Sequence, residues 1–328
     1  MRRPQRRLRR RRRSPPRKAK ALDIVREDFD AALDLLRAAG FRIDVIYPAD
    51  DPHTALLSKD RESVRLLKPN AAPFIAGLPA FEPEAVLTKA GAASGQGRAG
   101  MLYRDLIPGR LGGRYVASHI TIPGGGPVSD WVHFHRISLQ MIFVRRGWVR
   151  VVYEDQGAPF VMNEGDLVLQ PPEIRHRVLE SSGPLEVVEI TAPAAHETFA
   201  DHRMELPAGD RPNRLYSGQR FLHHVAEETA WTPFHGAEAQ ETQMLAATGG
   251  LCEVRTIRRA DATDLELGPH DGELVFGFVL DGRVRLNGTP LDAADAFVIP
   301  PGEGSKLADM SKDFLLLHVT TARLDATA

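Results

Sequence analysis

Residues 126–147 read GPVSDWVHFHRISLQMIFVRRG, and residues 165–176 read GDLVLQPPEIRH. His133 and His135 are two residues apart, so on a β-strand both side chains point to the same face. The distant His176 can complete a triangle of imidazoles only if the sheet curls into a barrel. Glycines within these segments permit tight turns between short strands. The two segments therefore predict three imidazoles that converge inside a small β-barrel.

The sequence around these segments is typical of an all-β protein. From Tyr115 onward, short apolar runs alternate with Gly and Pro clusters every 8–12 residues. The same texture resumes near Thr242 and continues to Thr320. Residues 192–240 between them are polar and irregular, and we expect their five histidines to be on the surface: His196, His202, His223, His224 and His235.

A smaller unit of mixed structure precedes these modules. Apolar residues recur at helical spacing from Asp23 to Ala39, and Gly40 is a suitable helix stop. Short apolar runs predict strands at Phe41–Tyr47, Thr54–Leu57 and Ser63–Leu67. Residues 69–99 are rich in Pro, Ala and Gly, which is typical of a linker.

The two quoted segments resemble the paired motifs of the cupin superfamily. The first family motif is a glycine, His-x-His, three or four residues, a Glu, six residues and a glycine; the second is a glycine, five residues, Pro-x-Gly, two residues and a His. This chain matches at His133, His135, Gly147, Gly165, Pro171 and His176, and Gly126 is one residue further from His133 than usual. It departs at Gln140, where the family has Glu, and at Glu173, where the family has Gly.

The resemblance implies that His133, His135 and His176 bind a divalent metal. Gln140 is then either a fourth ligand or a group that hydrogen-bonds a substrate oxygen, and we assign it a catalytic role without choosing between these. Imidazole ligation suits Fe, Cu, Ni or Zn. Three-histidine iron is what a likeness to cupin dioxygenases, such as gentisate-type bicupins, implies; Fe(II) is therefore the expected metal, with Zn, Mn, Ni and Cu left open.

The second module resembles a decayed copy of the first. Aligning Gly282 with Gly147 places His270 opposite His135, Gly268 opposite His133 and Val275 opposite Gln140. Asp295, Pro300 and Gly302 survive in the second motif, but Ser305 takes the place of His176. One histidine cannot hold a metal. We therefore expect His270 to be structural and this barrel to be a packing partner.

These observations predict a mainly β protein with two cupin-type double-stranded β-barrels (jelly rolls). We expect a disordered Arg-rich tail over 1–20, a small α/β segment and linker over 21–99, and a metal-binding barrel over 100–200. A linker over 201–240 and a degenerate barrel over 241–328 follow.

Composition limits the class of protein further. The 328 residues are 43% hydrophobic and 26% charged, which is ordinary for a globular protein. No apolar stretch approaches the roughly 18 residues of a membrane span, and no signal-peptide core follows the basic start. The single Cys252 cannot form an internal disulfide, so we expect a reduced, buried thiol and a cytoplasmic protein. A homo-oligomer stays open.

The net charge of −1 combines a basic tail with an acidic body. Residues 1–20 contain twelve Arg and Lys and no acid, which leaves 30 basic against 43 acidic residues elsewhere. Such a tail repels itself and should be disordered. It is either an extension without function, or a start codon placed too early, or a segment that binds phosphate backbones. The acidic body makes a nucleic-acid partner an unfavoured interpretation.

Gln in place of Glu would leave a metal dication bound by three neutral imidazoles. Such a site attracts an anionic substrate. Arg175 and Arg136, each next to a metal-binding histidine, are candidate substrate clamps, although strand alternation would turn both away. His119 and Tyr115 share a strand face and are further candidates for substrate binding.

Two hypotheses follow. The leading one is a metal-dependent, Fe(II)-type dioxygenase that combines a small anionic organic substrate with O₂. The alternative is a non-catalytic, metal-dependent ligand-binding or regulatory bicupin. Isomerases and lyases use the same fold, and fold alone does not decide function.

Overall fold

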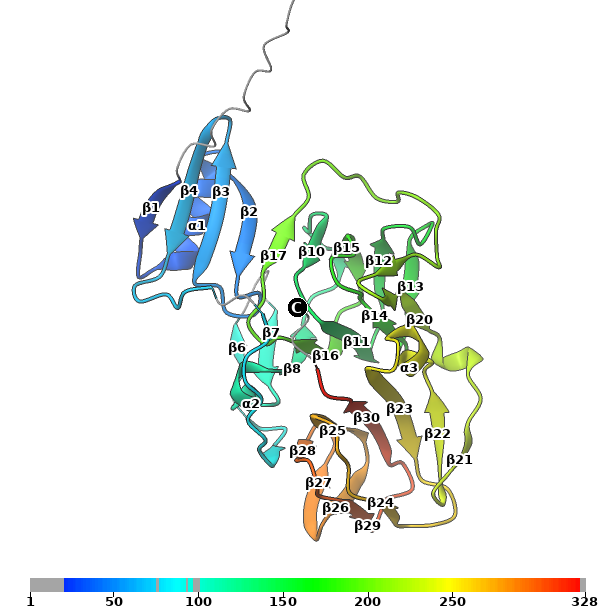
Figure 1. The fold of residues 1–328 in the computed structure, drawn as a ribbon. Coiled ribbons are helices and arrows are strands. Elements are labelled where there is room, and N and C mark those ends of the chain that lie inside the picture. The colour runs from blue at the N-terminus through cyan, green and yellow to red at the C-terminus, as the bar shows by residue number, and fades with distance from the viewer. Residues whose placement is uncertain (1–20, 75–76, 93, 97–100, 325–328) are drawn as a thin grey trace, which may run out of the picture.

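The computed structural model describes residues 21–74, 77–92, 94–96 and 101–324. These residues form two β-barrels that lie side by side and a small α/β module next to the first barrel (Figure 1). The basic tail, expected to be disordered, lies outside the described residues. No helix in the described part of the chain is long and apolar enough to cross a membrane.

The N-terminal module is one helix on a four-stranded sheet of order β1-β4-β3-β2. Its elements are β1 (Leu22–Val25), α1 (Phe29–Ala38), β2 (Arg42–Tyr47), β3 (Thr54–Lys59) and β4 (Glu62–Leu67). The prediction of a helix from Asp23 is wrong at its start. Residues 22–25 instead pair in parallel with β4, and the helix begins where the Asp28 carboxylate accepts a hydrogen bond from the Ala31 N–H at 3.0 Å.

The first barrel is made of two sheets. One has the order β20-β14-β11-β16-β8-β7-β6, and the other continues from the N-terminal module as β2-β17-β10-β15-β12-β13. The strands are β6 (Gly95–Gln96), β7 (Leu102–Asp105), β8 (Val116–Ile122), β10 (His133–His135), β11 (Leu139–Arg146), β12 (Val149–Tyr153), β13 (Phe160–Met162), β14 (Leu167–Leu169), β15 (His176–Ser181), β16 (Leu185–Ala192), β17 (Thr198–Ala200) and β20 (Leu222–His224). Shorter elements are α2 (Arg110–Gly113), β9 (Gly126–Pro127), β18 (Leu215–Tyr216) and β19 (Gln219–Arg220).

The second barrel also has two sheets, of order β21-β22-β23-β30-β25-β28-β5 and β24-β29-β26-β27. The strands are β5 (Val86–Thr88), β21 (Thr232–Phe234), β22 (Ala237–Glu241), β23 (Cys252–Arg258), β24 (Leu265–Leu267), β25 (Leu274–Asp281), β26 (Arg283–Leu286), β27 (Thr289–Asp292), β28 (Ala296–Ile299), β29 (Ser305–Ala308) and β30 (Leu315–Thr321). The short helices η2 (Ala226–Glu228) and α3 (Met244–Ala247) lie along the chain before β23.

The two barrels repeat one topology strand for strand. The order β20-β14-β11-β16-β8-β7-β6 in the first corresponds to β5-β28-β25-β30-β23-β22-β21 in the second, and β10-β15-β12-β13 corresponds to β24-β29-β26-β27. The register agrees as well, because Gln140 pairs with Thr191 and Val275 pairs with Thr320. Residues in one barrel can therefore be matched to residues in the other.

The barrels pack through their seven-stranded sheets. Alternate residues of β11 and β25 enter one shared core: Leu139, Met141, Phe143, Leu274, Phe276 and Phe278. The residues between them point into their own barrel, so each of these strands is buried on both faces. This arrangement fixes which side chains can face an internal cavity.

The two expected linkers are not plain linkers. Residues 69–99 contain β5, which pairs with β28 of the second barrel. Residues 201–240 contain β20, which pairs with β14 of the first barrel, and most of β22, which pairs with β23 of the second. Unpaired strand edges need partners for their backbone groups, and these segments supply them.

Candidate metal centre

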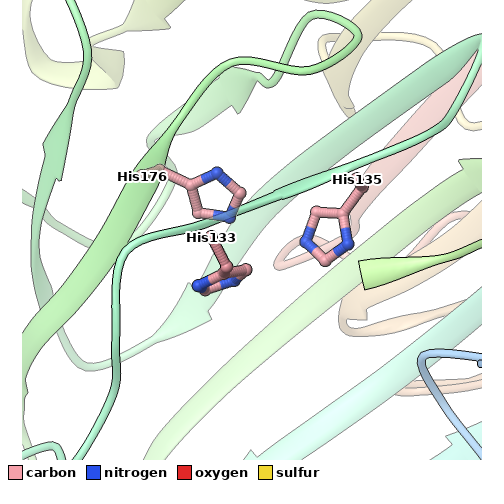
Figure 2. A group of neighbouring side chains, drawn as sticks. All are labelled: His133, His135 and His176. Carbon is pink, nitrogen blue, oxygen red and sulfur yellow. The ribbon is translucent and has the colours of Figure 1, made fainter. Parts of the chain in front are cut away.

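Three histidines meet inside the first barrel. His133 and His135 lie on β10, and antiparallel pairing places His176, the first residue of β15, directly opposite His133. The ring centroids of His133 and His176 are 4.2 Å apart, and both lie 5.2 Å from His135. All three are buried, and one ligand atom from each lies within 4.8 Å of the others (Figure 2). No other such group of His, Cys, Asp and Glu occurs in the described part of the chain.

Each of the three rings is held by its Nδ1 atom. His133 Nδ1 is 2.8 Å from the Trp131 carbonyl oxygen, and His176 Nδ1 is 3.0 Å from the Ile174 carbonyl oxygen. A carbonyl only accepts, so Nδ1 of both rings carries the proton and Nε2 carries the lone pair. His135 Nδ1 lies 2.9 Å from the Thr198 hydroxyl, which can hold it in the same tautomer. Contacts of this kind orient imidazole rings in proteins that bind metals.

The triad faces a cavity of about 150 Å³ within the barrel. Its walls are mostly aliphatic, and they come from β8, β11, β12, β15 and β16: Val116, Ile120, Ile122, Ile142, Val149, Val151, Val178, Leu185 and Val187. A few polar side chains interrupt these walls. This mixture of apolar surface and few polar groups is typical of a small-molecule site.

Gln140 lines the cavity within a chain of hydrogen bonds. Its Nε2 donates to the Glu189 carboxylate at 3.1 Å, and its Oε1 accepts from Gln170 Nε2 at 2.9 Å. Gln170 Oε1 accepts from the Tyr153 hydroxyl. This series of hydrogen bonds fixes the orientation of both amide groups. A carboxylate can only accept, so the Gln140 amide nitrogen must point toward Glu189.

The exchange of Glu for Gln at position 140 removes a negative charge from the motif. Glu189 brings a negative charge to the cavity from another strand. It lies on β16, and the Thr191 hydroxyl donates to the same carboxylate oxygen at 3.2 Å. Burial, reinforced by the charge of Glu189, raises the pKa of the Tyr153 hydroxyl, which therefore stays a donor. The cavity thus contains a carboxylate, on the strand next to the usual motif position.

Comparisons with known proteins agree with this geometry. Residues 118–191 match the family model described as a cupin domain. Because the second barrel repeats the same strand order, the chain contains this fold twice. The chain has the fold of a bicupin.

Solved structures with this fold include several enzymes. A salicylate 1,2-dioxygenase from Pseudaminobacter salicylatoxidans matches with 18% identity and a TM-score of 0.51, over 74% of the bicupin and 86% of that chain. A mutant form of the same enzyme, in complex with gentisate, matches with 21% identity and a TM-score of 0.52, over 75% and 84%. A mutant oxalate decarboxylase from B. subtilis matches with 10% identity and a TM-score of 0.51, over 76% and 78%. No curated protein matches the sequence.

Two of the residues proposed from sequence for substrate binding face away from the cavity. Tyr115 is fully buried, and its hydroxyl donates to Glu273 at 3.1 Å and lies 3.0 Å from Thr321. Glu273 precedes β25, and Thr321 ends β30, so both belong to the second barrel. His119 Nε2 lies 2.9 Å from the Glu186 carboxylate. Other residues of β8 line the cavity instead: Val116, Ser118 and Ile120. The sequence indicated a shared face correctly, but it is the face against the other barrel.

The two arginines proposed as anion clamps also lie outside the cavity lining. Arg136 forms an ion pair with Glu197 at 3.1 Å and covers the ring of Phe199. Arg175 pairs with Asp201 at 3.3 Å and covers the ring of Phe134. Strand alternation explains both, because each is the immediate neighbour of a histidine that points inward.

Sequence reasoning missed other polar residues that line the cavity: Asp50, Gln170, Glu189 and His196. His196 was expected on the surface, but it is 3% exposed and its ring packs at 5.4 Å against that of His135. His224, expected there too, is also buried, on β20. One signal could have found Glu189. Inward-facing residues alternate along a strand, and β16, which carries Glu189, is paired with β11, which carries Gln140.

The second barrel has different residues at the matching positions. Val275 corresponds to Gln140, and Ile299, its partner on β28, corresponds to Gln170. His318 corresponds to Glu189, because each lies two residues before the threonine that pairs with position 275 or 140. His270 Nε2 donates to the Ile299 carbonyl oxygen at 3.0 Å.

Proposed function

We propose that this bicupin is an Fe(II)-dependent dioxygenase that acts on a small anionic organic substrate with O₂. The observation that carries the proposal is the buried triad of His133, His135 and His176, whose rings are held by contacts at Nδ1. Three imidazole nitrogens suit Fe, and also Zn, Ni or Cu. An iron(II) ion in this site would supply redox chemistry for a reaction with O₂.

The protein's own residues account for the preference for an anion. The three imidazoles are neutral as metal ligands, so the charge of a bound dication is not cancelled by the side chains that hold it. Glu189 offsets part of this charge, but its carboxylate is engaged by the Gln140 amide, which donates to it. A small carboxylate entering the cavity therefore gains attraction from the metal at the cost of some repulsion from Glu189.

The aliphatic walls have two further roles. They bind the carbon skeleton of the substrate through burial of apolar surface. They also exclude water, which strengthens the electrostatic interactions inside the cavity. The Gln140 amide, fixed by Glu189 and Gln170, can orient a substrate oxygen without changing its own position.

The solved structures support the proposal only at the level of fold. Salicylate 1,2-dioxygenase is an O₂-dependent enzyme by name, whereas oxalate decarboxylase is a lyase by name with the same fold. The choice between them rests on the substrate that the cavity accepts. The free, buried Cys252 supports a reducing, cytoplasmic setting for iron(II).

Metal analysis and O₂ uptake test the proposal together. We expect elemental analysis of protein purified without a histidine tag to find about one iron per chain. An oxygen electrode should record uptake with at least one member of a panel of small carboxylates, including salicylate and gentisate, and none with His133→Ala. His270→Ala is the matched control in the other barrel. Zinc, or no metal, together with ligand binding and no uptake, would instead support the metal-dependent binding protein.

A further inference from the structure

We propose that the second barrel binds a small organic carboxylate without a metal, in a pocket where Arg255 supplies the positive charge. The pocket has a volume of about 290 Å³. It is separate from the cavity of the histidine triad, because the two have no lining residue in common. The inference therefore goes beyond the proposed dioxygenase activity and does not depend on it.

The pocket occupies the place in the second barrel that the metal cavity occupies in the first. On β24 and β29, Leu267 pairs with Ser305, as His133 pairs with His176 in the first barrel. Both Leu267 and Ser305 line the pocket. A leucine and a serine cannot replace two imidazoles as metal ligands. A ligand in the second pocket must therefore be held by other groups.

The matched strand positions also differ in charge. On β8 and β16 of the first barrel, Ser118 pairs with Glu189, and both line the cavity. On β23 and β30 of the second, Arg255 pairs with His318, and both line the pocket. Burial lowers the pKa of His318 to about 4, so this histidine is uncharged at neutral pH. The first barrel thus presents a negative charge at these positions, and the second presents a positive one.

Arg255 is oriented by its neighbours but not sealed by them. Its Nε donates to Glu241 at 2.7 Å, and its Nη2 forms an ion pair with Glu253. The guanidinium also lies over the ring of Phe234, which lines the pocket. The Arg255 side chain is 15% exposed, and neither of these two carboxylates engages its Nη1 atom. Nη1 can therefore donate a charge-assisted hydrogen bond to a carboxylate in the pocket.

Nearby carboxylates weaken this attraction without cancelling it. Glu241 is 43% exposed and Glu253 is 29% exposed, so water and salt screen both. Glu303 lines the pocket as well, but it is exposed. A ligand carboxylate at Nη1 would contact the cation directly, whereas Glu241 and Glu253 contact other nitrogens of the same group. Because Coulomb energy falls with distance, the contact with the cation outweighs the repulsion.

The rest of the lining suits the carbon skeleton of such a ligand. Ser305 and Thr320 add hydroxyls that can donate hydrogen bonds to an anion. Apolar walls with a few polar groups are typical of a site for a small organic molecule. Much of this pocket is apolar, formed by Phe234, Leu267, Val275 and Ile299.

Isothermal titration with three probes of one shape tests the inference. Benzoate, benzamide and benzylamine are negative, neutral and positive at neutral pH. The titration uses the full chain with His133→Ala, which removes one ligand of the triad in the first barrel, and the wild-type chain in parallel. We expect the His133→Ala chain to bind benzoate about tenfold more tightly than benzamide, and benzylamine least tightly.

Variants of Arg255 show whether this residue causes the preference. Arg255→Leu, added to His133→Ala, should bring the ratio of benzoate to benzamide affinity close to one. Arg255→Lys keeps the positive charge and should retain a severalfold preference. Arg258→Leu is the matched control on the same strand, because Arg258 pairs with Glu238 and covers the ring of Trp231 outside the pocket lining. It should keep the tenfold ratio.

The wild-type chain gives an independent measurement. There, Arg255→Leu should lower the number of bound benzoate molecules by one, so the test stands even if His133→Ala is unstable. Melting temperatures show that each titrated variant is folded. Failure of the His133→Ala chain to bind benzoate, a preference for benzylamine, or an unchanged ratio and number of sites in Arg255→Leu would overturn the inference.

Discussion

The two barrels share one strand order but differ in what fills them. In the first, Ile142 of β11 faces Val168 of β14, and a cavity stays open beside the triad. At the matching place in the second barrel, Gly277 pairs with Phe297. The Phe297 ring occupies the space that a side chain at position 277 would need, because a Cβ on residue 277 would lie 2.1 Å from that ring. An aromatic ring thus fills space in the second barrel that smaller residues leave open in the first.

The polar residues differ in the same way. The first barrel joins Gln140, Gln170 and Glu189 in one hydrogen-bond chain, whereas the second has Val275, Ile299 and His318 at those positions. Both ring nitrogens of His318 are buried without a hydrogen-bond partner in the described residues. The second barrel still has a pocket, of about 290 Å³, and Val275, Ile299 and His318 line it. A few inward-facing residues therefore decide whether the pocket of this scaffold contains a histidine triad and a hydrogen-bonded polar series.

The largest expected difference between the barrels is in metal binding. His133→Ala or His176→Ala should abolish metal occupancy, because two imidazoles cannot replace three as a stable ligand set. His270→Ala, the control change in the second barrel, should leave about one metal per chain. Elemental analysis of the three variants measures this. Loss of metal from His270→Ala with retention in His133→Ala would show that the barrels have the opposite roles.

A second test places a charge beside the triad. Gln140 Nε2 lies 3.1 Å from the Glu189 carboxylate, so Gln140→Glu would place a second carboxylate beside the first. The two carboxylates would repel each other and would therefore retain a proton more readily. Any added negative charge should weaken binding of an anionic ligand by about 1–4 kcal/mol. Titration calorimetry with the metal-loaded protein measures this. Val275→Gln, at the matching position of the second barrel, should leave the affinity unchanged.

A third test uses the buried His318. Burial, with help from the charges of Arg255 and His270, lowers the pKa of His318 to about 4. The unfolded chain binds this proton below about pH 6.5 but the folded chain only below about pH 4, so folding stability falls as the pH falls through that window. The loss should be on the order of 3 kcal/mol. Urea unfolding across roughly pH 4–7 should show a flatter profile for His318→Leu; an identical slope would contradict the assignment.

The smallest expected effect comes from the basic tail. Deletion of residues 1–20 should leave the melting temperature, metal content and turnover unchanged, because exposed charges are screened beyond roughly 8–10 Å. Any nucleic-acid affinity should disappear with the tail, and in the full chain it should fall steeply with salt. Calorimetry and filter binding measure these quantities. A less stable or slower truncated protein would mean that the tail docks on the acidic body.

Much of the fold could be predicted from the sequence because its signals are local. Turn residues and apolar runs marked the strands of both barrels, and the spacing of His133, His135 and His176 required the curled sheet that brings them together. The alignment of Val275 with Gln140 agrees with the strand register. That the triad binds a metal stays a prediction.

The rest of the site depends on contacts between distant segments. Asp50 enters the cavity only because β2 joins β17, and no local pattern indicates that pairing. His119 lies on β8 and Tyr115 just before it, and both faces of this strand are buried, so alternation alone could not tell the cavity from the contact between barrels. The strand at 22–25 was missed because its apolar residues also fit helical spacing.

Strand β5 makes the chain order of the molecule differ from its spatial order. It precedes the first barrel in the chain but completes a sheet of the second, and the Ala90 N–H beside it donates to Asp295, 205 residues further along. During synthesis at about 5–20 residues per second, β5 would wait on the order of tens of seconds for its partner. The barrels also cannot be separated by a single cut, because any cut between them leaves the second one without an edge strand. The order of segments along the chain therefore differs from their grouping into the two folded barrels.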